Sequence, residues 1–186
     1  MKNNISNGLK KLLLHVCCAP CSAYVIQQLQ KDYDVSLFYF NPNIYPEDEY
    51  EIRKNESEKY AKNLGINFIE IKIGHNDWLS KIKGLENEPE RGKRCFVCYK
   101  YRLEETAKYA RDNNFDIFTT TLSISPHKSS EMINLVGSEI SKELVIEYLE
   151  ADWKKDGGFK RSCEISKENE FYRQNYCGCE FSINKK

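Results

Sequence analysis

Eight cysteines stand in this chain of 186 residues, and seven of them fall into three clusters. The clusters are Cys17, Cys18 and Cys21; Cys95 and Cys98; and Cys177 and Cys179. Cysteine thiolates bind metal ions and exchange electrons. Where thiols are kept reduced, structural disulfides do not explain such clusters of cysteines. The clustering therefore predicts metal or redox chemistry. Cys163 stands alone, and we assign it no role.

The first cluster lies where a strand predicted over residues 12–16 gives way to a helix predicted over residues 19–31. A helix N-terminus carries free backbone N–H groups and a partial positive charge, which together lower the pKa of a nearby thiol. A single buried cysteine is often only a small apolar residue. Three cysteines within five positions favour a set of metal-binding thiolates instead.

The second cluster has CxxC spacing at the start of a predicted helix, which lets two sulfurs face one ion. Cys95 and Cys98 would complete a set of four thiolates with Cys17 and Cys18. Four thiolates suit either zinc or an iron–sulfur cluster, and the spacing alone leaves a structural zinc site as an alternative. Cys21 would be left over beside the metal, and a spare ligand favours an open or second metal position.

The third cluster is a CxC pair, Cys177 and Cys179. A disulfide between them would close a small, strained ring, and strained disulfides are the ones that tend to be catalytic or labile. We predict a redox-active pair that relays electrons. Further metal ligands or idle thiols are the alternative.

The composition is that of a soluble globular protein, with 40% apolar residues, 30% charged residues and a formal net charge of zero. The length fits a single domain over residues 1–186, with a flexible N-terminus over residues 1–10. No signal peptide or membrane-spanning run is visible, so we expect a cytoplasmic protein without a membrane partner. Zero net charge excludes a polycation, so any contact with nucleic acid must be local.

Strand patterns and helix patterns alternate along the chain. Strands are predicted over residues 12–16, 34–40, 66–73, 115–121 and 144–151. Helices are predicted over residues 19–31, 47–64, 96–113, 128–140 and 167–176, with a short helix near Trp78 and Ser166 as the cap of the last one. This alternation predicts an α/β fold with a mostly parallel five-stranded sheet and helices on both faces. Ligands bind at the carboxyl ends of such strands, where the first cysteine cluster and residues 125–129 would both lie.

Five stretches of the chain together resemble one known family. They are HVCCAPCS, FNPNIYPEDEYEIR, RCFVCYKYRLEETA, TTLSISPHKS and GGFKRSCEISKENEFYRQNYCGC, which span roughly residues 11–182. The chain is similar there to the cobalamin-independent epoxyqueuosine reductases (QueH). The resemblance implies the last step of queuosine synthesis, in which the epoxide oxygen is removed from the cyclopentane ring of epoxyqueuosine at the wobble position of tRNA.

The resemblance also implies a [4Fe-4S] cluster and a second, mononuclear iron beside it. The implied cluster ligands are Cys17, Cys18, Cys95 and Cys98. The redox-active disulfide would be Cys177 with Cys179, and Cys21 is our candidate for a catalytic ligand of the second iron. The implied protein is an iron–sulfur oxidoreductase.

The implied fold is nucleotide-hydrolase-like and related to the PP-loop ATPases. Those proteins carry a Gly- and Ser-rich phosphate loop directly after the first strand. Here the same position reads CCAPCS, residues 17–22, without the glycines that let a backbone approach a phosphate. We therefore predict that a metal site replaces the phosphate loop.

Removal of an epoxide oxygen as water consumes two electrons and two protons, so a redox metal is chemically apt. The chain has no GxGxxG dinucleotide fingerprint, and we expect an external electron donor. His127 is the candidate proton donor, with an ordinary loop residue as the alternative. His15 stands inside a predicted strand and is expected to be a buried core histidine.

Two segments, residues 91–102 and 154–161, combine cations with aromatic side chains beside cysteines. Cations can hold phosphates, and aromatic rings can stack on a splayed anticodon base of the tRNA. The predicted tRNA-binding residues are Lys93, Arg94, Lys100, Arg102, Lys160 and Arg161. A solvated charged face is the alternative.

Two other functions compete with the reductase. A zinc-stabilised RNA-binding module would explain the CxxC pair and the basic segments, but not the surplus thiols or the CxC pair. A thioredoxin-like oxidoreductase would use Cys18 and Cys21 and would leave Cys95 and Cys98 unexplained. We therefore favour the reductase.

Overall fold

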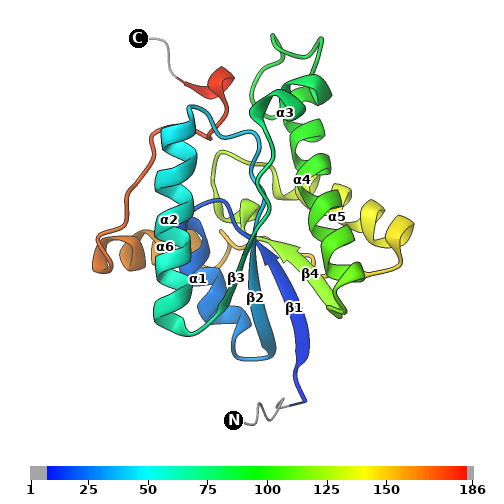
Figure 1. Ribbon diagram of the computed structural model, residues 1–186. Coiled ribbons are helices and arrows are strands. Elements are labelled where there is room, and N and C mark those ends of the chain that lie inside the picture. The colour runs from blue at the N-terminus through cyan, green and yellow to red at the C-terminus, as the bar shows by residue number, and fades with distance from the viewer. Residues whose placement is uncertain (1–7, 184–186) are drawn as a thin grey trace.

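The computed structural model describes residues 8–183, and a five-stranded parallel sheet of order β3-β2-β1-β4-β5 forms its centre (Figure 1). The strands are β1 Lys10–His15, β2 Tyr33–Tyr39, β3 Asn67–Glu70, β4 Ile117–Thr120 and β5 Glu147–Tyr148. Every neighbouring pair in the sheet is parallel. The predicted α/β fold is confirmed.

Helices cover both faces of this sheet (Figure 1). They are α1 Ala19–Leu29, α2 Glu47–Leu64, α3 His75–Lys81, α4 Lys93–Asp112, α5 Ser130–Leu144 and α6 Gly158–Glu168, with short 3₁₀ turns at Leu122–Ile124 and Glu180–Ser182. Helices α1, α2 and α6 pack on one face and helices α4 and α5 on the other. None of the described helices is long and apolar enough to cross a membrane.

The central strand β1 is apolar on both sides because both sides are covered. Leu12 and Leu14 belong to the apolar core beneath α1 and α2, whereas Leu13 belongs to the core beneath α4 and α5. Successive side chains on a strand point to opposite faces, so a doubly covered strand reads as a continuous apolar run rather than an alternating one.

The carboxyl ends of β1 and β4 meet at one rim of the sheet, and His15 joins them. Its side chain is fully buried, and Nδ1 lies 2.9 Å from the hydroxyl oxygen of Thr120. Burial, and after it the nearby Arg102 guanidinium, lower the pKa of His15 to about 3. The prediction of a buried core histidine is confirmed.

The prediction of a last helix over residues 167–176 is wrong. Helix α6 runs over Gly158–Glu168, so Ser166 lies inside the helix and does not cap its start. The chain enters α6 through Gly157, whose φ of +80° favours glycine. A Cβ on Gly158 would lie 1.9 Å from the carbonyl oxygen of Trp153, so this close approach also requires glycine. Residues 169–179 have no regular structure and run beside α2, which they contact through Phe171, Tyr172 and Cys177.

Other differences concern the ends of elements. β5 has two residues where a strand over residues 144–151 was predicted, and β3 has four. α5 begins at Ser130, since the hydroxyl of Ser129 accepts a hydrogen bond from the backbone N–H of Met132 and caps the helix there. Lys10 already belongs to β1, so the predicted N-terminal tail is too long, and residues 1–7 lie outside the described residues.

Candidate active site

Cys17, Cys18 and Cys21 form a compact cluster, the α1 thiol group, between the end of β1 and the start of α1. Their three sulfurs lie within 4.8 Å of one another, and those of Cys17 and Cys18 are 3.8 Å apart. Cys18 is the N-cap residue of α1, and Pro20 lies in the first turn. The chain leaves the strand at this point, so two adjacent side chains can converge instead of pointing to opposite faces.

The neighbouring segment after β2 supports this turn. Asn41, from the FNPN stretch, donates a hydrogen bond through Nδ2 to the carbonyl oxygen of Val16, at 2.9 Å. The backbone N–H of Val16 bonds to the carbonyl oxygen of Phe38, also at 2.9 Å. The backbone N–H and C=O of Val16, the residue before the α1 thiol group, are therefore both hydrogen-bonded.

The three cysteines of the α1 thiol group shift one another's pKa values. Hydrogen bonds from Cys18 and Cys21 lower the pKa of Cys17 well below its usual value. The hydrogen bond with Cys17, together with burial, raises the pKa of Cys18 to about 12 against the effect of Cys21, and hydrogen bonds with Cys17 and Cys18 raise the pKa of Cys21. A metal ion bound by these three sulfurs would displace the protons that they otherwise share.

The α1 thiol group fits a thiolate-bound metal. Two thiolates on one tetrahedral ion, with metal–sulfur distances of about 2.3 Å, lie about 3.8 Å apart, as the sulfurs of Cys17 and Cys18 do. An all-sulfur donor set suits zinc or iron–sulfur coordination, and three ligands leave one position open. Within residues 8–183, no other set of three Cys, His, Asp or Glu ligand atoms comes this close together.

The remaining clustered cysteines come together as a second thiol group near the start of α4. Its members are Cys95, Cys98, Cys177 and Cys179. Cys95 and Cys98 lie in the first two turns of α4, and neither joins the α1 thiol group at metal-site distance. Burial raises the pKa of Cys98 to about 11 and also raises that of Cys179, which packs beside it against Trp78. All eight cysteines are free thiols.

Two buried cations lie between the thiol groups. Arg102 on α4 is 2% exposed and donates to the side-chain oxygen of Asn41 at 2.5 Å. Burial lowers the pKa of Arg102, but Cys98 and Cys17 outweigh it and the pKa is raised. The pKa of Lys128, 8% exposed, is raised against its burial in the same way by Cys177 and Cys17. Each cation therefore places a positive charge near cysteines of both groups.

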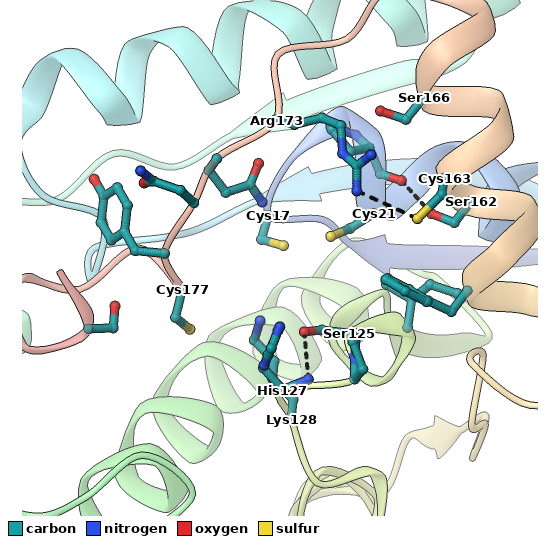
Figure 2. A pocket seen from close by; sticks show the side chains of 18 of the residues that line it. Cys17, Cys21, Ser125, His127, Lys128, Ser162, Cys163, Ser166, Arg173 and Cys177 are labelled. Carbon is teal, nitrogen blue, oxygen red and sulfur yellow. Dashed lines mark hydrogen bonds between the residues drawn. The ribbon is translucent and has the colours of Figure 1, made fainter. Parts of the chain in front are cut away.

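A cavity of about 450 Å³ opens beside the α1 thiol group (Figure 2). Most of its lining comes from four segments, which are the start of α1, residues 124–128, helix α6 and residues 173–177, and Glu90 and Ser182 complete it. Figure 2 shows Cys17 and Cys21 on one side, Lys128 and His127 on another, and Cys177 at the edge of the same space. A smaller cavity with Cys95 and Cys179 shares the side chains of His127, Lys128 and Cys177. The candidate catalytic residues therefore surround one site.

Two of the predicted tRNA-binding residues are buried, so the prediction that they contact tRNA is wrong. Arg94, 3% exposed, donates to the carbonyl oxygens of Glu86, at 2.8 Å, and of Glu88, and its guanidinium lies 4.8 Å from the centre of the Phe181 ring. Arg102 faces the thiol groups, as described above. The guanidinium of Arg94 bonds to backbone carbonyl groups inside the fold, and that of Arg102 faces sulfur atoms there. Neither guanidinium can therefore reach a phosphate.

The other four cations are at least partly accessible. Lys93, Lys160 and Arg161 are exposed, and Lys100 is half-buried. Arg161 pairs with Glu164 and Glu168 on its own helix, at 3.1 Å each.

Three site residues had no predicted role at the thiols, although Arg91 belongs to the basic segment over residues 91–102. Gln174 donates through Nε2 to the sulfur of Cys18 at 3.1 Å. The backbone N–H of Arg91 lies 3.3 Å from the sulfur of Cys95, and its side chain bonds to the carbonyl oxygens of residues 126 and 127. Lys128 completes the set. Gln174 and Lys128 stand inside the motifs YRQNYCGC and SPHKS, which is the only signal that pointed to them.

The sheet order and the β1–α1 junction define a class: an α/β protein of the PP-loop ATPase-related fold with a cysteine cluster where the phosphate loop would stand. The solved structure of the U34-tRNA thiolase NcsA from Methanococcus maripaludis, with its [4Fe-4S] cluster, has a TM-score of 0.56 and 12% sequence identity to this chain. The match covers 95% of this chain and 62% of the thiolase. This likeness confirms the fold.

The family model of the epoxyqueuosine reductase QueH matches residues 12–185. Epoxyqueuosine reductase QueH of Acinetobacter baylyi is 43% identical over 185 residues, which cover 98% of this chain and 85% of that protein. The Histophilus somni protein of the same name is 42% identical over 184 residues, 98% of this chain and 76% of that protein. The chain belongs to the epoxyqueuosine reductase QueH family, which confirms the resemblance seen in its motifs.

Proposed function

We propose that this protein is an epoxyqueuosine reductase that converts epoxyqueuosine at the tRNA wobble position to queuosine. The observation that carries this proposal is the α1 thiol group on the wall of a cavity of about 450 Å³. That size suits a small-molecule ligand or a nucleotide extruded from the anticodon loop. Membership of the QueH family names the reaction.

The cofactor we propose is a [4Fe-4S] cluster with a second iron beside it. The proposed ligands of the cluster are Cys17, Cys18, Cys95 and Cys98. Cys21 is the proposed ligand of the second iron. Bound iron would supply electrons and act as a Lewis acid toward the epoxide oxygen. The all-sulfur donor set and the spacing of the α1 thiol group support this choice.

The proposed electron relay is the pair Cys177 and Cys179. Oxidation of two thiols to a disulfide releases two electrons and two protons, and conversion of an epoxide to an alkene and water consumes the same number. An external donor would then reduce the disulfide. Cys177 lines both cavities, which supports its access to the reaction.

Residues of the cavity wall are proposed to donate protons and to stabilise the charge on the leaving oxygen. His127, exposed and lining both cavities, is the proposed proton donor. The buried ammonium of Lys128 places a positive charge at the same wall, where negative charge develops on an oxygen that leaves carbon.

The proposed tRNA contacts are the accessible cations Lys93 and Lys100 on α4 and Lys160 and Arg161 on α6. Phe159, at 39% exposure on the cavity wall, offers a ring for stacking. With tRNA as its substrate, we propose that the protein acts in the cytoplasm.

The test combines metal analysis with turnover. Protein purified without oxygen should contain iron and sulfide and show broad visible absorption that bleaches with dithionite. Incubated with reductant and tRNA that carries epoxyqueuosine, it should form queuosine, as measured by mass spectrometry of the digested nucleosides. Cys17→Ser should lose iron and turnover, whereas Cys163→Ser, altered at the lone cysteine of the same cavity, should keep its iron.

The proposal would be contradicted if the protein is colourless, contains zinc, takes up no iron and sulfide on reconstitution and forms no queuosine. A zinc-stabilised RNA-binding module would then explain the site better.

A further inference from the structure

Two residues that line the cavity each carry a buried polar side-chain atom with no hydrogen-bond partner among residues 8–183. The hydroxyl of Ser166 on α6 is buried, with the side chain 2% exposed, and the amide oxygen Oε1 of Gln174 is buried as well. Both residues line the cavity of about 450 Å³. Most buried polar atoms in folded proteins are paired, so two unpaired atoms on one cavity wall point to a ligand that supplies the missing hydrogen bonds.

We propose that Ser166 and Gln174 form a subsite that binds the hydroxyl groups of the substrate's cyclopentane ring. The inference rests on the proposed function, because the ring that carries the epoxide also carries two vicinal hydroxyls. A hydroxyl both donates and accepts a hydrogen bond, whereas the amide oxygen of Gln174 only accepts. One ring hydroxyl would donate to Gln174, and its neighbour would pair with the hydroxyl of Ser166.

The amide of Gln174 connects this subsite to the α1 thiol group. Its nitrogen is committed to the sulfur of Cys18, at 3.1 Å, which leaves Oε1 as the group that can receive a ligand. The epoxide and the hydroxyls belong to the same five-membered ring. A ring held at Oε1 therefore has its epoxide beside the α1 thiol group.

Ser166 is held in place relative to that group. One turn earlier on α6, the hydroxyl of Ser162 donates to the carbonyl oxygen of Pro20 at 2.6 Å and ties α6 to the first turn of α1. Figure 2 shows Ser162, Cys163 and Ser166 along α6, facing the space that contains Cys17 and Cys21. Ser166 thus stands on a helix that is tied to α1, and Gln174, in the irregular segment that follows, is held by its hydrogen bond to Cys18.

The variants Ser166→Ala and Ser162→Ala form a matched pair on one helix. Ser166→Ala removes a polar atom without a partner, so the urea midpoint of unfolding should stay the same or rise, and kcat/KM for epoxyqueuosine tRNA should fall about 3- to 10-fold. Ser162→Ala removes a paired hydroxyl, and its midpoint should fall. The visible spectrum of Ser166→Ala should match that of the parent, since Ser166 has no bond to the thiols.

Binding of three tRNAs separates recognition of the ring from any general effect on tRNA. The Ser166→Ala variant should bind tRNA with epoxyqueuosine or queuosine about 3- to 10-fold more weakly than the parent, because both carry the ring hydroxyls. For tRNA with unmodified guanine at the wobble position, the affinities should be equal. An equal loss for all three tRNAs, no loss for any of them, or a fall in the urea midpoint of Ser166→Ala would overturn the subsite.

The failure of the subsite is distinguishable from the failure of the proposed function. A parent protein that forms no queuosine contradicts the function. The comparison of queuosine tRNA with guanine tRNA tests the subsite without any turnover.

Discussion

The two thiol groups differ in the way the chain brings their sulfurs together. The α1 thiol group comes from five consecutive positions at one strand–helix junction, and its sulfurs lie within 4.8 Å of one another. The second thiol group joins the start of α4 to a C-terminal segment without regular structure. The first group is therefore local and the second depends on the complete fold.

Helix α2 holds the C-terminal part of the second thiol group. The buried guanidinium of Arg53 pairs with Glu49 at 2.6 Å and donates to the carbonyl oxygen of Cys177 at 3.1 Å. Gly178, between the two cysteines, has a φ of +134°, and a Cβ there would lie 3.1 Å from the same guanidinium. The CxC pair thus requires glycine at its centre because of backbone conformation and because Arg53 approaches it closely.

The largest expected effect comes from single cysteines of the second thiol group. Cys98→Ser, at a proposed cluster ligand, should lose iron and turnover. Cys177→Ser, at the proposed redox pair, should keep its iron and visible spectrum but lose turnover by more than about 100-fold, the upper end for residues that only orient a ligand. Iron analysis and turnover of both anaerobic variants test this division. Loss of iron from both would make the whole group metal ligands.

A smaller effect is expected from the residue that holds the C-terminal segment. Arg53→Met leaves the Glu49 carboxylate buried without its cation, so the free energy of unfolding should fall by about 3–5 kcal/mol. Lys72→Met is the control. Lys72 pairs with Glu51 at 2.8 Å on the surface, and its loss should cost less than about 1 kcal/mol. Urea unfolding measures both.

The same variant distinguishes the two thiol groups. In Arg53→Met under folding conditions, Cys177 should be alkylated faster by iodoacetamide than in the parent, and Cys21 at an unchanged rate, as followed by peptide mass spectrometry. Equal acceleration at both cysteines would contradict a separate support for the second group.

The smallest effect is expected at the surface beside the second thiol group. Lys93 is exposed at the start of α4, and Lys93→Gln should weaken tRNA binding a few-fold and reduce the slope of log K against log salt by about 1. Lys31→Gln, at the opposite end of the fold just after α1, should change neither quantity. Identical salt slopes for the two variants would remove Lys93 from the tRNA interface.

Local patterns in the sequence were enough for the α/β fold and the α1 thiol group. The apolar run over residues 12–16 indicates a strand covered on both faces. The cysteines of the α1 thiol group follow it directly in the chain. Their convergence needs only a strand end and a helix start. The cysteine motifs were also sufficient to identify the family.

Contacts between distant segments were decided only by the tertiary structure. The charges of Arg94 and Arg102 suggested a surface that binds tRNA, but carbonyl groups and sulfurs from other segments surround them. The sequence predicts Ser166 as a helix cap, whereas α6 begins at Gly158 and carries Ser166 to the wall of the cavity. A residue type states what a side chain can bond to. Which partners reach it depends on how sheet, helices and the C-terminal segment pack together.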